Sequence, residues 1–270
     1  MGKIDWVKYE KDVREWSEGI KPQKHKERFL RDGIVNEKEW NKEGNVKTLF
    51  IFKEHYGRST GMYINFLKAK SWLDLTDENE MNDIFKYPEW GKIATLAKGI
   101  EKAIVTGWYI SKDDYHPEKC DHRKEINKIA IMNLKKLAGG VKPGSKRSQE
   151  SMDYIEHCKR FSKEIRDQIE YINPNFIVCC SEDVYKCLKR YIYPKYKREQ
   201  NFFALDNGTA VVVCCQPAYE GINKENFKDK FFSLPANVAL SLMIGHNEPL
   251  RKYYEKRYDD MLAEGKDYED

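Results

Sequence analysis

The stretch VKTLFIFKEHYG, residues 46–57, joins a strand pattern to polar side chains that a strand does not need. Five of the six residues 46–51 are apolar or β-branched, which predicts a buried strand over 46–52. The residues that follow are Lys53, Glu54, His55 and, after Tyr56, Gly57. An acid and an imidazole at the end of a buried strand indicate a functional site at that end.

Three more apolar segments predict strands: KIAIMNL at 128–134, FIVCC at 176–180 and TAVVVCC at 209–215. Helical patterns cover 6–40, much of 61–110, 150–172, 182–191 and 234–245. Short, wholly apolar strands that alternate with helices are typical of a parallel sheet covered on both faces. We therefore expect an α/β fold, a three-layer αβα sandwich with a central, mainly parallel four-stranded sheet.

Length and composition predict one globular domain over residues 1–270. We divide it into a helical segment at 1–45, an α/β core at 46–245, and a C-terminal helix with an acidic tail at 246–270. Hydrophobic residues make up 40% and charged residues 34%, with no apolar run of membrane-spanning length and no signal-peptide pattern at the start. We expect a cytoplasmic monomer.

The seven cysteines include two adjacent pairs inside predicted strands, Cys179-Cys180 and Cys214-Cys215, which predicts reduced core residues. A closely spaced set that could hold zinc consists of His116, Cys120 and His122, with His157 or Cys158 as further candidates. The chain has no CxxC pair, so we favour polar loop residues over a metal site, and we expect no metal and no cofactor.

Two basic tracts stand out in a chain whose net charge is only +4. Residues 135–147 hold five basic side chains and no acid, and residues 186–198 hold six with three interleaved tyrosines. Basic loops with aromatic residues suit phosphate contact and base stacking, and a solvated surface is the alternative for each tract. The expected phosphate contacts in the first tract are Lys135, Lys136, Lys142, Lys146 and Arg147.

Polar residues follow all four predicted strands: Lys53-Glu54-His55, Asn133, Ser181-Glu182 and Gln216-Pro217. In open α/β sheets the ligand lies just beyond the carboxyl ends of the strands. One crevice at that edge could therefore receive all of these side chains.

The order of these segments resembles that of the uracil-DNA glycosylase superfamily. FKEHYG stands where the family has a motif of glycine, an acid or amide, and usually proline. AIMNLKK matches the strand that ends in a base-recognising asparagine, and IRDQIEYINPNFIVCC resembles the family's helix, proline and apolar strand. CCQPAYEG stands where the family has His-Pro-Ser before a loop that enters the minor groove. Lys53, Tyr56, Gln216 and Ala218 depart from the family pattern.

The resemblance implies hydrolysis of a base-sugar bond in DNA after the base has been flipped out of the duplex. Glu54 would stabilise the sugar cation or activate water, and His55 is the competing catalytic group. Asn133 and Gln216 would hold the base beside Tyr56 and Gly57. Tyr219 would wedge into the gap that the base leaves.

Gly57 stands near the position where uracil-specific members have an aromatic residue that excludes 5-substituted pyrimidines. Glycine leaves room for a bulky base, and the chain is similar to a bacterial anti-phage glycosylase that removes glucosylated hydroxymethylcytosine from viral DNA. We therefore expect excision of a modified pyrimidine from double-stranded phage DNA. The alternatives are a uracil-DNA glycosylase of base-excision repair, a non-catalytic nucleic-acid or nucleotide-binding member of the fold, and a small-molecule nucleotide hydrolase.

Overall fold

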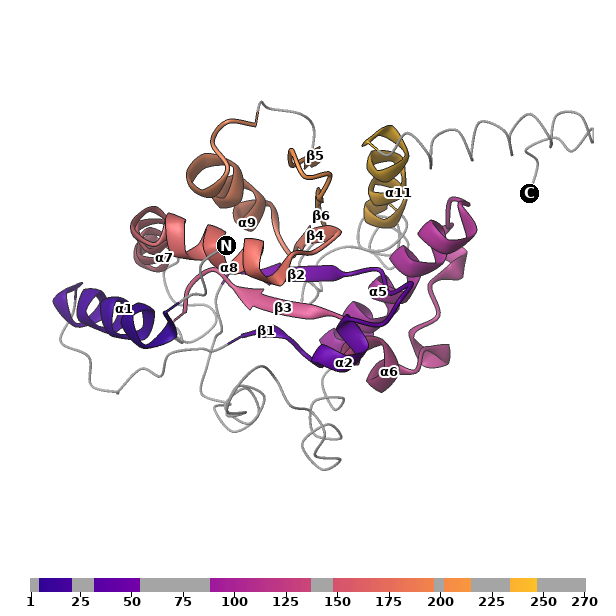
Figure 1. Cartoon of the computed structure of the whole chain (residues 1–270), viewed down its shortest axis with the longest axis horizontal. Coiled ribbons are helices and arrows are strands. Elements are labelled where there is room, and N and C mark those ends of the chain that lie inside the picture. Colours follow the sequence, from indigo (N-terminus) through magenta and orange to yellow (C-terminus); the bar gives the residue numbers. More distant parts are fainter. Residues whose placement is uncertain are drawn as a thin grey trace, which may run out of the picture.

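The computed structural model describes residues 5–20, 32–53, 88–136, 148–196, 202–214 and 234–246, which form a mixed six-stranded sheet flanked by helices (Figure 1). The strands are β1 (Gly33–Ile34), β2 (Thr48–Phe52), β3 (Ala130–Asn133), β4 (Phe176–Cys179), β5 (Phe202–Ala204) and β6 (Ala210–Val213). Their order is β1-β3-β2-β4-β6-β5. The expected count of four strands is wrong, because β1 and β5 add an antiparallel strand at each edge.

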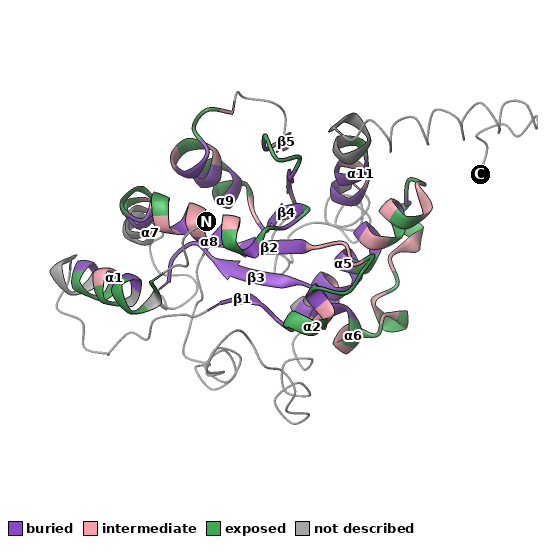
Figure 2. Ribbon diagram, in the orientation of Figure 1, coloured by how far each residue is buried: buried purple, intermediate pink, exposed green. Residues whose placement is uncertain are grey.

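Strands β3, β2, β4 and β6 run parallel to one another at the centre of the sheet. They are almost wholly buried because helices cover both faces (Figure 2). Successive side chains alternate between the two faces: Phe50 packs into one apolar cluster, and Leu49 and Ile51 pack into the other. A strand buried on both faces needs an unbroken apolar run, which is the pattern seen in the sequence.

The first helical layer contains α5 (Pro88–Thr106), α6 (His122–Asn127) and α11 (Leu234–His246). The second contains α1 (Trp6–Ile20), α7 (Ser148–Arg160), α8 (Ser162–Ile172) and α9 (Glu182–Cys187), which continues as the π-helical turn η3 (Leu188–Ile192). Helices on both faces of the sheet agree with the expected αβα layering. Within the described part of the chain, no helix is both long and apolar enough to cross a membrane.

Several boundaries differ from those expected. The helix predicted over 150–172 is two helices, α7 and α8, separated at Phe161. Helix α8 ends where Asn173 adopts a left-handed conformation, φ 50°, directly before Pro174. The segment 6–40, expected to be helical, contains strand β1 and the short helix α2 (Glu37–Trp40) as well as α1. The helix expected before residue 88 and the C-terminal helix and tail after residue 246 lie outside the described residues.

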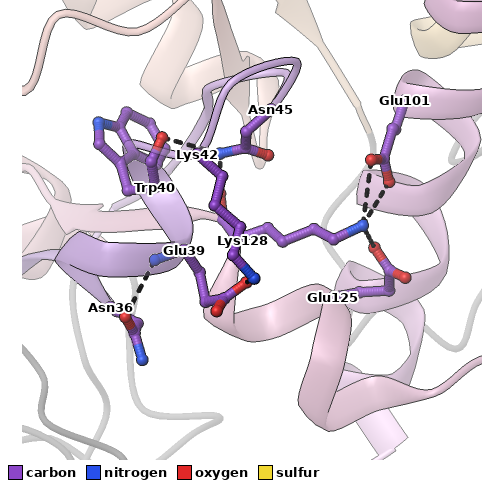
Figure 3. Close-up of polar contacts among 8 residues, drawn as sticks. All are labelled: Asn36, Glu39, Trp40, Lys42, Asn45, Glu101, Glu125 and Lys128. Carbon is purple, nitrogen blue, oxygen red and sulfur yellow. Dashed lines mark hydrogen bonds and ion pairs between the residues drawn. The ribbon is translucent and has the colours of Figure 1, made fainter.

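Ion pairs of Lys128 and hydrogen bonds of Asn45 hold the loops that lead into β2 and β3 (Figure 3). The ammonium of Lys128 lies 2.7 Å from Glu101 in α5 and 3.1 Å from Glu125 in α6. Burial lowers the pKa of Lys128, but the hydrogen bonds to both carboxylates outweigh it and raise the pKa overall. The side-chain amide of Asn45 donates to the carbonyls of Trp40 and Lys128. These contacts fix the amino ends of β2 and β3 and do not involve their carboxyl ends.

Candidate functional site

The carboxyl ends of the parallel strands are held in register beyond the last strand residues. Phe52 lies opposite Asn133, and the Leu134 amide donates to the Phe52 carbonyl at 2.9 Å. The Lys135 amide then donates to the Lys53 carbonyl at 3.0 Å. The ends of β2 and β3 therefore leave the sheet side by side.

The same edge continues across the rest of the parallel sheet. The amide of Cys180 donates to the carbonyl of Ile51, and that of Cys214 donates to the carbonyl of Cys179, both at 2.9 Å. The chain passes from β2 to β3 on one side and later to β4 on the other side of β2. This change of direction makes the β2/β4 boundary a topological switch point, where open α/β sheets bind their ligands.

Lys53 occupies this switch point, and sequence reasoning assigned it no role. Its ammonium lies 5.2 Å from the ring centroid of Tyr154 and 3.8 Å from the carboxylate of Asp183. Asp183 is mostly exposed, so this long ion pair is weak. Burial raises the pKa of Tyr154, which keeps the phenol neutral under Lys53. A positive group therefore stands at the carboxyl edge immediately before Glu54.

The expected base-recognition residue, Asn133, lies at the end of β3 and is bound by Asp32, the residue directly before β1. One carboxylate oxygen of Asp32 accepts from the Asn133 backbone amide at 2.6 Å and from its Nδ2 at 3.3 Å. The other oxygen accepts from Lys136 Nζ at 2.5 Å and from Gln168 Nε2 at 2.9 Å. All four side chains are buried. We call these four residues the Asp32 cluster.

Lys136 therefore belongs to the interior of the protein and not to its surface. Its side chain is fully buried in the ion pair with Asp32. Burial lowers the pKa of Lys136, and the charge of Asp32 opposes that shift. The expectation of a phosphate contact is corrected, because the ammonium already has a buried carboxylate partner. Lys135, expected to contact phosphate as well, is only 9% exposed.

His157 completes this side of the core. Its Nε2 accepts from the backbone amide of Lys136 at 3.4 Å, and its ring packs edge-on against Trp16. Burial lowers the pKa of His157 well below its usual value, and the charges of Lys135 and Lys136 add to that shift. The imidazole is thus a neutral acceptor that orders the chain after β3.

Most other residues expected at the site lie outside the described residues. They are Glu54, His55, Tyr56, Gly57, Lys142, Lys146, Arg147, Gln216 and Tyr219. In the sequence, Glu54 follows Lys53 directly and Gln216 comes two residues after Cys214, the last described residues beyond β2 and β6.

The second basic tract leads away from this edge. Lys186 pairs with Glu182 at 2.9 Å on α9, and Lys195 and Tyr196 both bind Asp206. Asp206 belongs to the turn between β5 and β6, which precedes the amino end of β6. From α9, whose Asp183 faces Lys53, the described part of this tract therefore runs to the opposite edge of the sheet.

The cysteine and histidine sets have no metal-site geometry. None of the described cysteines forms a disulfide, and Cys179, Cys180 and Cys214 are buried, as expected for core thiols. His122 bonds the carbonyl of Pro117 at 2.8 Å, and His116 bonds its neighbour Glu118. Among the described residues, no three His, Cys, Asp or Glu side chains are grouped to hold a metal ion.

No family model matches the sequence, and no curated protein is significantly similar to it.

Proposed function

We propose that this protein is a DNA glycosylase that flips a modified pyrimidine out of duplex DNA and hydrolyses its bond to deoxyribose. One observation carries the proposal: the hydrogen bond between Lys135 and Lys53 joins the ends of β3 and β2. The amide of Asn133 and the acid that follows Lys53 thus belong to adjacent strand ends. The reaction needs an amide that binds the base and a carboxylate, and the sequence has one of each at these two strand ends.

Cleavage of the base-sugar bond builds positive charge on the deoxyribose and negative charge on the departing base. Glu54 stabilises the sugar cation and orients the attacking water, with His55 as the alternative base. Asn133 and Gln216 hold the base. Gln216 donates a hydrogen bond but cannot carry a proton as histidine can, so it suits a stabilised leaving group.

Gly57 is the reason for proposing a modified base as the substrate. Uracil-specific members of the superfamily have a blocking aromatic residue near this position. Glycine leaves space for a substituent on carbon five, such as a glucosylated hydroxymethyl group. Such bases mark viral DNA, so the proposed role is anti-phage defence. The uracil-DNA glycosylase-like fold is part of the same proposal, supported by the order of the segments in the sequence.

The non-catalytic alternative has one observation in its favour, because the Asn133 side chain is engaged by Asp32 inside the protein. A protein that binds nucleic acid without excising a base could keep this asparagine for structure alone. Glu54 argues against that alternative, since binding alone does not require an acid at the strand end.

The test is a panel of duplex oligonucleotides that carry uracil, cytosine, 5-hydroxymethylcytosine or its glucosylated form at one position. Excision is scored as alkali-labile abasic sites under single-turnover conditions. We expect cleavage at the modified cytosine, and a Glu54→Gln variant should lose about a hundredfold or more in rate while it still binds DNA. The control is Glu156→Gln, which neutralises an exposed acid on α7. Binding without excision of any base would favour the non-catalytic alternative.

A further inference from the structure

The side-chain oxygen of Asn133 is a buried acceptor that lacks a partner among the described residues. Asn133 is 1% exposed, and its Oδ1 makes no hydrogen bond there. Leaving such a group unsatisfied destabilises the fold, so native proteins usually provide a donor. A donor from a bound molecule is one way to satisfy it.

Asp32 decides which end of the Asn133 amide is left for that donor. A carboxylate only accepts hydrogen bonds, so the group 3.3 Å from Asp32 Oδ2 must be the amide nitrogen. If the amide were flipped, two oxygens would face each other in the protein interior. The orientation seen here therefore follows from the chemistry of Asp32.

Asp32 is itself held by groups from two other elements. Lys136 Nζ and Gln168 Nε2 bind its second carboxylate oxygen, and Gln168 Nε2 also binds its backbone carbonyl at 3.1 Å. The carboxylate is fixed before any ligand arrives. Preorganisation of this kind is what a recognition residue needs from its neighbours.

We propose that Asp32 is a positioning residue that locks the Asn133 amide, so that Oδ1 accepts a hydrogen from the flipped base. The inference rests on the proposed glycosylase function and adds a requirement for its substrate. The base must carry an N–H on the edge that meets Asn133, as the exocyclic amine of cytosine-type bases or N3–H of uracil-type bases does. A base with methyl groups in place of those hydrogens should be rejected.

The variant that tests this role is Asp32→Leu combined with Lys136→Met, which removes the ion pair without leaving a buried charge. Its fold is checked by thermal melting. Excision of 5-hydroxymethylcytosine or uracil, whichever the wild type prefers, should fall about tenfold, the equivalent of one hydrogen bond. Discrimination against the matching analogue, N4,N4-dimethylated or N3-methylated, should shrink severalfold because the amide is free to rotate.

The matched control is His157→Phe, which removes the buried acceptor of the Lys136 backbone amide but leaves the contacts of Asp32 with Asn133 in place. A positioning role predicts that this control keeps the discrimination between the base and its methylated analogue. A merely structural role predicts equal behaviour of the two variants. Unchanged discrimination in the double variant would overturn the proposal while leaving the glycosylase function intact.

A second measurement does not depend on excision or on a variant of Asp32. In wild-type protein with labelled asparagine, the Asn133 side-chain amide protons should show nuclear Overhauser contacts to the β-protons of Asp32. The signals are identified by their loss in Asn133→Ala. Absence of the contacts would overturn the positioning of Asn133 by Asp32. Their presence in a protein that excises no base from the panel would instead refute the proposed function, and with it the role in base recognition.

Discussion

The ammonium of Lys136 lies 2.5 Å from the carboxylate of Asp32, and neither side chain is exposed to solvent. This pair connects the end of β3 to the first residue before β1, at the edge of the sheet. A buried pair contributes little net stability relative to apolar residues, but breaking it leaves an uncompensated charge. Replacing one partner of the pair should therefore destabilise the protein much more than replacing both with apolar residues.

Lys136→Met alone should lower the free energy of unfolding by about 3–5 kcal/mol, because the charge of Asp32 stays buried without its counter-ion. The double variant Asp32→Leu/Lys136→Met should lose much less. Denaturant unfolding followed by circular dichroism measures both. As a control, Lys163→Met removes an exposed partner of Asp167 and should change stability by less than about 1 kcal/mol. A double variant as unstable as the single one would show that the pair itself stabilises the fold.

Buried His157 should make the protein less stable in mild acid. Its folded-state pKa lies well below the ordinary value near 6.5, mainly because of burial. Below that pH the unfolded chain binds a proton at His157 and the folded protein does not, so protonation favours unfolding. The stabilising effect of the neutral ring is complete above about pH 6.5 and is lost as the pH falls toward the folded-state pKa.

The measurement is the free energy of unfolding between about pH 7 and pH 5 for the wild type and for His157→Phe, which keeps an aromatic ring beside Trp16. The wild type should lose up to about 1.4 kcal/mol more per pH unit than the variant. His116→Gln, which removes an exposed imidazole, serves as the control. Parallel pH profiles for wild type and His157→Phe would mean that the folded protein protonates this imidazole as readily as the unfolded chain does.

Local sequence patterns predicted the core of the fold but not the partners of its polar residues. The central strands could be recognised because helices on both faces demand wholly apolar runs. The edge strands β1 and β5, two and three residues long, are too short for a pattern to appear. The break at Phe161 within the predicted helix over 150–172 could not be recognised, because the sequences on both sides of it are amphipathic.

Misassignment of Lys136 had a different cause. Two lysines before a glycine-rich segment are typical of a solvated loop, and the buried partner of Lys136 lies 104 positions away. Asp32 was missed for the same reason, because Asn133 lies 101 positions from it. Such pairs arise from the antiparallel pairing of β1 with β3, which the sequence around residue 32 did not predict.

The two basic tracts should contribute unequally to DNA binding. Replacing Lys142, Lys146 and Arg147 with glutamine should weaken binding to all sequences and reduce the salt slope by up to about three, one for each lost phosphate contact. The matched control replaces Lys189, Arg190 and Lys195, because this part of the second tract leads from α9 to Asp206 at the opposite edge of the sheet. Fluorescence anisotropy at several salt concentrations gives both slopes. A larger change of salt slope in the control would indicate that DNA binds at the opposite edge of the sheet.

The last prediction concerns Gly57→Tyr, which restores an aromatic side chain near the position where uracil-specific members of the superfamily have one. If glycine leaves space for a substituent on carbon five, a tyrosine should fill that space. Excision of glucosylated hydroxymethylcytosine should then fall much further than excision of any unsubstituted base that the wild type accepts. Rates on the two kinds of base are compared within the same variant, so a general loss of activity cancels.

Two controls distinguish a role of Gly57 in substrate selection from a role in the backbone conformation. Thermal melting of Gly57→Tyr comes first, because glycine tolerates backbone conformations that cost other residues about 1–2 kcal/mol. Gly57→Ala then adds a side chain too small to block a sugar substituent, so it should keep the preference for the bulky base if the backbone accepts it. Equal losses of excision rate on substituted and unsubstituted bases in both variants would show that Gly57 is needed for the backbone conformation and not for substrate choice. A selective loss in the tyrosine variant alone would assign substrate choice to the space beside this residue.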